Sequence, residues 1–197
     1  LSRIYHDAYR SNLIRSKYVT SPRPILVNNW EATYFDFDEE KLFNIAKAAK
    51  DIGLDMFVLD DGWFGKRNTD DSGLGDWVVN EEKIKGGLPK LVKKINAIGM
   101  KFGIWIEPEM VSEDSGLYRE HPDWVLKIPQ RSLMRSRHQL NLDITRKEVR
   151  DHVMKQIFRV LDSCKVDYVK WDMNRSVGNV YSAALPSERQ GEVYHRY

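Results

Sequence analysis

The sequence predicts an α/β fold in the form of a (β/α) barrel of the TIM type, of which only about the first five β/α units are present. Runs of apolar and β-branched residues alternate with segments of helical period along the 197 residues, a pattern typical of a parallel sheet with crossover helices. Polar and aromatic residues follow several of these runs at the end where barrel enzymes carry their active sites. These strand-end residues are Trp30, Asp60, Asp61, Trp105, Glu107, Asp143, Lys170 and Asp172.

A doubly wound sheet is the alternative layout, and it would normally show a glycine-rich phosphate-binding turn after an early strand. The turn after the first predicted strand, residues 28–31, contains no glycine. A complete barrel has eight strands and typically about 250 residues, whereas this sequence predicts only five strands. We therefore expect a partial barrel, with residues 1–20 as a lead-in segment and residues 21–197 as the amino-terminal part of the barrel domain.

The individual elements follow from apolar period and from capping residues. Asp38 caps a predicted helix that Gly53 closes, and residues 1–20 show no clear period. Strands are expected at residues 25–30, 56–59, 101–106, 139–143 and 166–175. Helices are expected at residues 39–51, 89–98 and 145–163, with a short helix near 115–120 and a short strand near 124–128 inside the long excursion 111–138.

The stretch 166–175 is the most informative part of the sequence. Its apolar first half predicts a buried strand, and its charged second half predicts that the strand ends at a site. Because side chains alternate across a strand, Lys170 and Asp172 are expected to point to one face and Trp171 to the other. Two charges on a buried face are costly to desolvate, so they indicate either a structural ion pair or a catalytic site.

Composition excludes several classes of function. The formal charge is +2, from 31 basic and 29 acidic residues that are interspersed, so no basic stripe marks a nucleic-acid partner. Cys164 is the single cysteine, which excludes an internal disulfide and a thiolate-rich metal site and fits a reducing compartment. No apolar run approaches about 18 residues and no signal peptide is apparent. We expect a cytoplasmic protein without a membrane partner.

The strand-end residues combine carboxylates with tryptophans, a combination that suits a sugar. Carboxylates accept hydrogen bonds from hydroxyl groups, and indoles cover the apolar face of a sugar ring. Glycoside hydrolysis in turn requires two carboxyl groups that flank the bond. Each residue also has a purely structural alternative: Asp61 and Asp143 can be helix or turn caps, and Glu109 can be merely solvated. The same holds for the tryptophans that can serve as core packing, Trp63, Trp77 and Trp124.

Several motifs in order resemble those of the family 36 glycoside hydrolases, the α-galactosidases of the melibiase type. The resemblance runs from about residue 22 to residue 176 and is specific because the motifs occur together. They are Leu59-Asp60-Asp61-Gly62-Trp63-Phe64, Gly75-Asp76-Trp77, the stretch Gly103 to Met110 (GIWIEPEM), Gln139-Leu140-Asn141-Leu142-Asp143, and Lys170-Trp171-Asp172-Met173-Asn174-Arg175.

The resemblance implies a role for each matching residue. Asp172 corresponds to the nucleophile, and Lys170 to a lysine that binds a substrate hydroxyl group and is expected to keep Asp172 ionised. Asp60 and Asp61 correspond to the aspartates that bind the galactose hydroxyls. The remaining substrate-binding positions are Trp30 and Trp105, which line the sugar pocket, Arg137, and Asn174 beside the nucleophile. No cofactor and no metal are implied.

The resemblance also implies that this chain is a fragment of a larger enzyme. The family's acid/base aspartate lies on a later strand that residues 1–197 do not contain, so the isolated chain is expected to be inactive and to associate through its open strand edges. The full-length enzyme is expected to be a retaining α-galactosidase and a homo-oligomer. Its expected substrates are α-galactoside oligosaccharides of the melibiose or raffinose type.

Three other readings of the sequence remain open. The first is an α-galactosyl transferase of the raffinose-synthase type, in which another sugar replaces water as the acceptor. The second is a metal-assisted barrel enzyme that stabilises an enediolate. The third is an inactive half-barrel that only binds a sugar.

Overall fold

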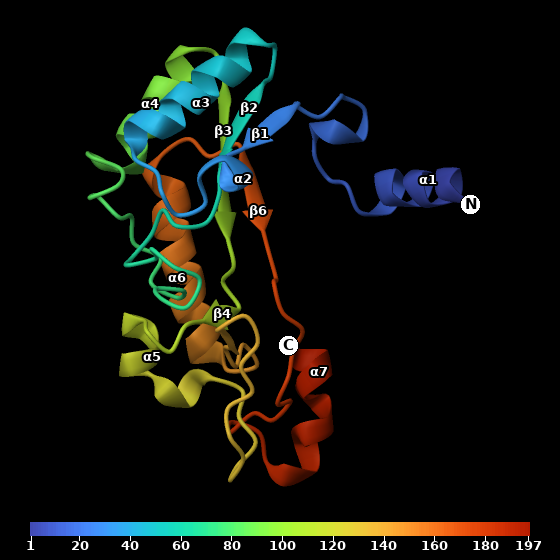
Figure 1. The fold of residues 1–197 in the computed structure, drawn as a ribbon. Coiled ribbons are helices and arrows are strands. Elements are labelled where there is room, and N and C mark those ends of the chain that lie inside the picture. The colour runs from blue at the N-terminus through green and yellow to red at the C-terminus, as the bar shows by residue number, and fades with distance from the viewer.

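A four-stranded parallel sheet organises the chain in the computed structural model, which describes all residues from 1 to 197 (Figure 1). The strands are β1 (Leu26–Asn28), β2 (Met56–Leu59), β3 (Lys101–Ile106) and β6 (Tyr168–Trp171), in the order β1-β2-β3-β6. Val58 pairs with Asn28 on one side and with Gly103 on the other, and Trp105 pairs with Lys170. All four strands therefore end at the same edge. The fold is α/β, as the sequence predicts.

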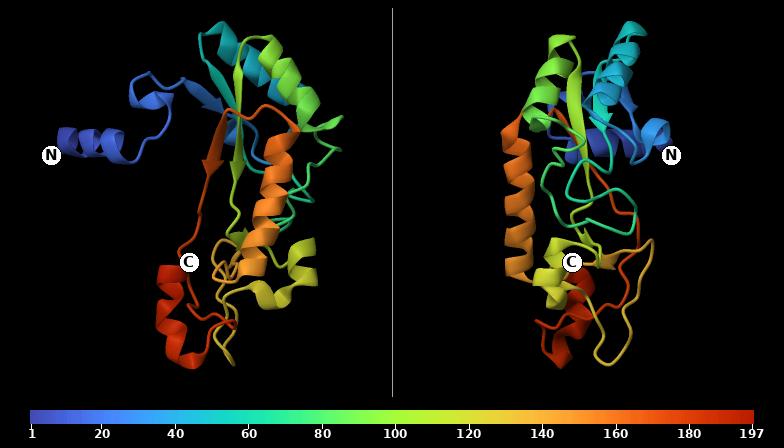
Figure 2. Two further views of the ribbon diagram at one scale, coloured as in Figure 1. Left: turned by 180° about the vertical axis from the view of Figure 1, so that it is seen from behind. Right: turned by 60° about the vertical axis from the view of Figure 1, so that its left-hand side comes forward.

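Three helices connect the strands and lie along the sheet (Figures 1 and 2). They are α3 (Glu39–Asp51), α4 (Gly87–Ala97) and α6 (Lys147–Ser163), close to the three predicted ranges. Asp38 caps α3 as predicted, because its side chain accepts the Lys41 backbone N–H at 2.8 Å. Their buried stripes join β2 and β3 in one apolar core; these stripes include Leu42, Ala46, Leu88, Leu91, Ile95, Val149, Val153 and Ile157.

The prediction that residues 139–143 form a strand of the main parallel sheet is wrong. Residues 140 and 141 form β5 (Leu140–Asn141), which pairs antiparallel with β4 (Met110–Val111) in a separate two-stranded sheet. The physical reason is that the excursion after β3 supplies a nearer partner than the main sheet: the Leu142 N–H donates to the Glu109 carbonyl at 2.8 Å. The parallel sheet consequently has four strands where the sequence predicts five.

The rest of this excursion is helical and irregular. A short helix α5 (Gly116–Glu120) begins at Ser115, whose side chain accepts the Tyr118 N–H, so the predicted helix near 115–120 is confirmed. The predicted strand near 124–128 is wrong. A 3₁₀ turn, η2 (Pro122–Trp124), is followed by a single bridge between Val125 and Leu142.

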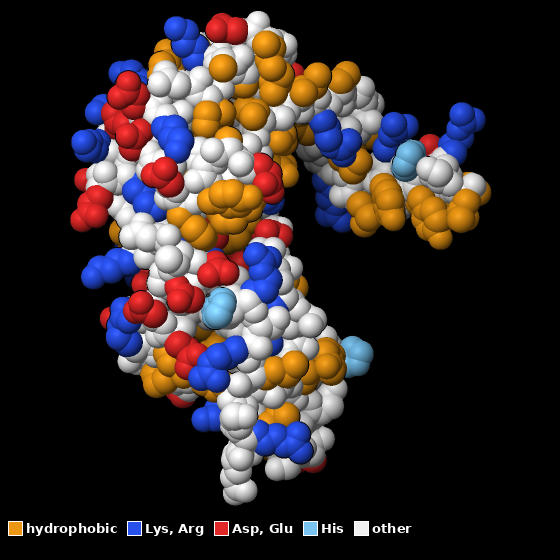
Figure 3. All heavy atoms as spheres, in the orientation of Figure 1, with side chains coloured by type: hydrophobic (Ala, Val, Ile, Leu, Met, Phe, Trp, Pro, Cys, Tyr) orange, Lys and Arg blue, Asp and Glu red, His pale blue; other side chains and the backbone are white.

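The two ends of the chain also hold helices. The lead-in segment forms α1 (Ser2–Asn12) and a 3₁₀ turn η1 (Lys17–Val19), and α1 extends away from the body (Figures 1 and 2). Its apolar side chains gather on one side and stay exposed, among them Ile4, Tyr5 and Tyr9 (Figure 3). At the carboxyl end, the 3₁₀ segment η3 (Ser187–Glu192) leads into α7 (Val193–Arg196).

The expectation that residues 166–175 form a buried strand is wrong for this chain. β6 is an edge strand with a neighbour on one side only, so Tyr168 is 41% exposed and Trp171 49% exposed. β1 forms the other open edge of the sheet. None of the helices is both long and apolar enough to cross a lipid bilayer.

Candidate active site

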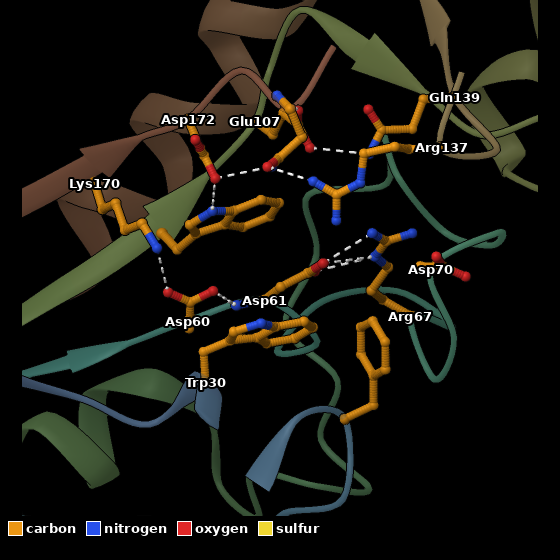
Figure 4. Close-up of a pocket in the computed structure, with 13 residues that line it drawn as sticks. Trp30, Asp60, Asp61, Arg67, Asp70, Glu107, Arg137, Gln139, Lys170 and Asp172 are labelled. Atoms are coloured by element: carbon orange, nitrogen blue, oxygen red, sulfur yellow. Dashed lines mark hydrogen bonds and ion pairs between the residues drawn. The ribbon is translucent and has the colours of Figure 1, made fainter. Parts of the chain in front are cut away.

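A pocket of about 310 Å³ opens at the carboxyl ends of the four parallel strands (Figure 4). Pockets that bind small molecules typically measure from about 300 to 1,000 Å³, so this one can hold a sugar ring. All eight residues to which the resemblance assigns a catalytic or substrate-binding role lie in its wall: Trp30, Asp60, Asp61, Trp105, Arg137, Lys170, Asp172 and Asn174. Their meeting at one edge is the consequence of parallel strands that end together.

Asp172 lies just beyond β6 and is fixed by hydrogen bonds to both carboxylate oxygens. Oδ2 accepts Trp105 Nε1–H at 2.9 Å and Asn174 Nδ2–H at 2.8 Å, and Oδ1 accepts the Met173 backbone N–H at 3.0 Å. Burial raises the pKa of Asp172, but these hydrogen bonds, with a smaller attraction from Lys170, outweigh burial and hold the pKa below its usual value. Asp172 is therefore a carboxylate at neutral pH.

The role expected for Lys170 needs a correction. Lys170 and Asp172 point into the same pocket and Trp171 points away, with its indole N–H on Glu109, so the predicted alternation is confirmed. Lys170 Nζ, however, pairs with Asp60 Oδ2 at 2.8 Å and contributes least among the groups that lower the pKa of Asp172. The donors that keep Asp172 ionised are mainly Trp105 and Asn174.

Asp60 is a buried carboxylate whose two oxygens are both engaged. Oδ2 accepts hydrogen bonds from Lys170 Nζ and from Asn28 Nδ2, and Oδ1 accepts the Asp61 backbone N–H at 2.9 Å. The Asp60 backbone N–H donates to the side chain of the buried Asn29 at 2.8 Å. Asn28 and Asn29, at the end of β1, thus set the position of Asp60 at the end of β2.

Asp61 forms a buried bidentate ion pair with Arg67. Arg67 Nε lies 3.0 Å from Oδ1, and Arg67 Nη2 lies 2.8 Å from Oδ2. The side chains are only 2% (Arg67) and 8% (Asp61) exposed. Asp61 is therefore more than a turn cap, since its carboxylate neutralises a buried cation. Sequence reasoning missed Arg67 because a lone arginine in a polar loop carries no signal of its partner.

Glu107, directly after β3, joins the opposite wall of the pocket. It is fully buried, and its oxygens accept the Asn174 backbone N–H and, at 3.1 Å, the Gln139 side-chain amide. Burial raises the pKa of Glu107, hydrogen bonds from Asn174 oppose the rise, and the charges of Asp172 and Asp61 add to it. Arg137 Nη1 completes this wall by donating to Asn174 Oδ1 at 2.6 Å.

Aromatic rings form part of the pocket wall. Trp30 and Trp105 line it, and Trp105 also belongs to the apolar core, where it is 2% exposed. Trp30, the first residue of α2 (Trp30–Thr33), packs edge-on against Tyr34 and Phe35 with centroids 5.1 Å apart. Core packing is the right interpretation for three others, which are buried in the apolar core and do not line the pocket: Trp63, Trp77 and Trp124.

Two of the acidic residues weighed in the sequence analysis, Asp143 and Glu109, lie outside the pocket. Asp143 accepts the backbone and hydroxyl hydrogens of Thr145 and the hydroxyl of Ser182, so capping is its structural role. Glu109 accepts the Trp171 indole N–H and is not merely solvated. No three His, Cys, Asp or Glu side chains in the chain are arranged to hold a metal ion, so the geometry adds no support to the metal-assisted alternative.

The pocket has five further lining residues that the predicted site lacks: Phe35, Arg67, Asp70, Glu107 and Gln139. Glu107 and Gln139 do lie in the motifs that carry the resemblance, and Glu107 follows a predicted strand, so a signal existed for both. Phe35 and Asp70 come from loops, where side-chain direction has no period from which it can be read.

Comparison with known proteins identifies the relatives of this chain. The melibiase family model matches residues 1–197. Alpha-galactosidase AgaA of Geobacillus stearothermophilus is 52% identical over 197 residues, which are all of this chain and 27% of that protein. The bifunctional alpha-galactosidase/sucrose kinase AgaSK of Mediterraneibacter gnavus is 57% identical over 194 residues, which are 98% of this chain and 21% of that protein.

Solved structures show the same likeness. The crystal structure of AgaA superposes with a TM-score of 0.96 at 52% identity, over 100% of this chain and 27% of that one. Variants of AgaA have been solved in complex with raffinose and with stachyose. The chain thus spans about a quarter of the length of the curated relatives that it matches.

Proposed function

Because the chain belongs to the melibiase family, we propose that it forms the nucleophile-bearing part of a longer α-galactosidase, built on the first strands of a (β/α) barrel. The whole enzyme removes terminal α-linked galactose from oligosaccharides such as raffinose and melibiose. Relatives that are 51–53% identical over all 197 residues are named alpha-galactosidases, which supports the proposal. The observation that carries it is the ionised Asp172, held by Trp105 and Asn174 in a pocket that also contains Asp60 and Asp61.

In the proposed reaction, the Asp172 carboxylate attacks the anomeric carbon of the galactosyl unit. The bond to the leaving oxygen breaks as a glycosyl ester forms on the opposite face of the sugar. Water then attacks the anomeric carbon from the face that the leaving oxygen vacated and releases the Asp172 carboxylate, so two inversions retain the anomeric configuration. The proton for the leaving oxygen comes from a carboxyl group outside residues 1–197. Both Asp172 oxygens accept hydrogen bonds, so the attacking atom is preorganised and keeps its charge until the bond forms.

Recognition of galactose is assigned to the side of the pocket formed by Asp60, Asp61 and Lys170. Asp60 and Lys170 form an acceptor and donor pair at 2.8 Å, which suits adjacent hydroxyl groups that each donate one hydrogen bond and accept another. Asp61, held by Arg67, provides a second acceptor. Trp30 and Trp105 cover the apolar face of the ring. Arg137 lies near the pocket mouth with Asn174 and is assigned to the same substrate.

The full-length enzyme is the longer polypeptide of which we propose these residues form a part. We expect it to hydrolyse p-nitrophenyl α-galactoside and raffinose. NMR of the first-formed sugar should show α-galactose. Initial release of β-galactose, or hydrolysis of the matching α-glucoside at an equal rate, would contradict the proposal. The cytoplasm and a homo-oligomer are the proposed location and assembly of this enzyme, and fractionation and light scattering test them.

Residues 1–197 alone are expected to show no turnover above background. Loss of a general acid typically lowers rates by about 10²–10⁴-fold, and the edges of β1 and β6 are open, so the isolated chain should associate and elute above 23.1 kDa. Gel filtration and a galactosidase assay check both. A monomer with substantial activity would mean that the acid lies within these residues.

A further inference from the structure

Glu107 is the one fully buried carboxylate in the pocket wall, and the proposed reaction gives it no task. It is 0% exposed and lies two residues beyond Trp105. Its oxygens are both occupied: Oε1 accepts the Asn174 backbone N–H, and Oε2 accepts Gln139 Nε2–H at 3.1 Å. A carboxylate that accepts two N–H donors is not in position to deliver a proton to a leaving group.

The contact between Glu107 and Asn174 connects Glu107 to Asp172, the proposed nucleophile. The Asn174 backbone is fixed by Glu107, and the Asn174 side chain donates to Asp172 Oδ2 at 2.8 Å. Arg137 holds the other end of the same amide at 2.6 Å.

The Asp172 backbone N–H donates to the Ile106 carbonyl at 2.8 Å, so hydrogen bonding to the end of β3 holds the chain as far as Asp172. The Asn174 backbone, two residues farther on, is held by Glu107. On the other side of Asn174, the buried Arg175 donates to the Met134 carbonyl at 2.9 Å and to the Gln139 carbonyl at 2.5 Å. Glu107 is therefore the contact that fixes the Asn174 backbone itself.

We propose that Glu107 is a positioning residue for the nucleophile: it holds the Asn174 backbone so that the Asn174 side chain stays on Asp172 and keeps that carboxylate in line for attack. The inference rests on the proposed function, because it concerns the step in which Asp172 forms a glycosyl ester. The alignment of Asp172 matters for the rate, because a displacement of a reacting group by about 1 Å can lower the rate on the order of 10²-fold.

The Gln139 side chain makes it possible to remove the charge of Glu107 and keep its hydrogen bonds. Its amide nitrogen faces the carboxylate, while its Oε1 is buried and has no hydrogen-bond partner. A flipped amide would place Oε1 against the negative charge of Glu107, so the charge sets the orientation. In the variant Glu107→Gln, the new amide can still accept the Asn174 N–H, and its NH₂ group can donate to Oε1 of a flipped Gln139. Both contacts are preserved without the charge.

The test compares Glu107→Leu with Glu107→Gln in the full-length enzyme. Glu107→Leu removes both acceptors and should lower kcat by about 10–10²-fold, while Glu107→Gln should recover most of that loss. The fall in Glu107→Leu should be similar for raffinose and for α-galactosyl fluoride, whose leaving group needs no proton. The inhibition constant of 1-deoxygalactonojirimycin should change by less than about threefold, because the hydroxyl-binding side of the pocket is untouched.

A double-mutant cycle with Asn174→Ala tests the route of the effect. If Glu107 acts through the Asn174 side chain, Glu107→Leu should cause little further loss in the Asn174→Ala background. Glu107→Asp, which withdraws the acceptor by one methylene and keeps the charge, should also lower kcat and serves if Glu107→Leu does not fold.

Four results would overturn the inference. The first is unchanged kcat in the folded Glu107→Leu or Glu107→Asp variant. The second is a loss confined to raffinose, which would make Glu107 an acid, and the third is losses that multiply fully in the cycle. Equal kcat for Glu107→Gln and Glu107→Leu would assign the effect to charge and would likewise overturn it. Wild-type enzyme without galactosidase activity would instead refute the proposed function, so the two failures are distinguishable.

Discussion

Replacing Asp172 by Asn in the full-length enzyme should lower kcat for α-galactosides by roughly 10⁴–10⁶-fold, the range seen when a catalytic nucleophile is removed. The affinity for galactose should change by less than about tenfold. The amide oxygen can take the place of Oδ2 and accept the Trp105 and Asn174 hydrogens. The bond from the Met173 N–H to Oδ1 is lost, but the amide has the size of the carboxylate, so the shape of the pocket is retained. The amide lacks the charge that makes the carboxylate a nucleophile.

Steady-state kinetics and galactose titration by calorimetry measure the two effects separately. Asp167→Asn is the matched control, since Asp167 precedes the same strand at its other end and accepts the Phe102 N–H at 3.3 Å. An amide can also accept that bond, so the control should keep its kcat. If Asp172→Asn lost galactose binding but kept its chemical step, Asp172 would be a ligand-holding residue and the assignment would fail.

The second large effect is expected at Asp60. Asp60→Ala removes the acceptor that we propose binds a galactose hydroxyl, and it leaves Lys170 Nζ and Asn28 Nδ2 without their common partner. A site built to bind a hydroxyl group discriminates against a substrate that lacks it by as much as 10⁴–10⁵-fold. We therefore expect kcat/KM for α-galactosides to fall by about 10³–10⁴-fold in Asp60→Ala, with a much smaller fall for the corresponding α-glucoside.

The ratio of the two kcat/KM values, measured with p-nitrophenyl glycosides, reports specificity and is insensitive to the amount of active enzyme. A variant with an unchanged ratio and unchanged kcat/KM would show that Asp60 has a structural role only. The fold should be preserved in Asp60→Ala, because Lys170 is 39% exposed and water can solvate its ammonium group. The thermal midpoint should confirm this.

Asp61 is expected to behave differently from its neighbour. Asp61→Ala leaves the Arg67 guanidinium buried without a counter-charge, and breaking a buried pair in this way typically costs about 3–5 kcal/mol. The thermal midpoint of this variant should therefore fall clearly. The double variant Asp61→Leu with Arg67→Met should recover most of the midpoint without recovering activity. A stable Asp61→Ala variant would mean that water reaches Arg67.

The parts of the fold that the sequence predicts well are those governed by period and capping. The α3 stripe and its Asp38 cap fix a helix at 39–51, and alternation along residues 170–172 places Lys170 and Asp172 in one pocket. The grouping of strand-end residues follows from strands that run parallel. These features depend on the chain within a few residues of each position, and a single sequence carries that information.

The features that were missed depend on contacts between distant segments. Residues 139–143 have the pattern of a barrel strand. Whether they pair with the main sheet or with β4 depends on where the chain runs after β3, which the local sequence does not determine. The expectation that residues 1–20 show no clear period is wrong for α1, because Ile4, Tyr5, Ala8 and Tyr9 recur at helical spacing. The role of Arg67 depends on its contact with Asp61, and the role of Gln139 on its contact with Glu107. Both contacts are made only in the folded chain, although Gln139 lies in a motif that carries the resemblance.

Covalent trapping of the nucleophile tests the central claim most directly. The full-length enzyme would be treated with a galactose-configured inactivator that leaves a long-lived glycosyl ester, digested with trypsin, and mapped by mass spectrometry. Cleavage after Lys170 and Arg175 yields the peptide 171–175, in which Asp172 is the one carboxylate side chain. The account predicts that the sugar mass is found on this peptide. A label on a peptide that holds Glu107, Asp60 or another carboxylate, or inhibition without any covalent adduct, would contradict it.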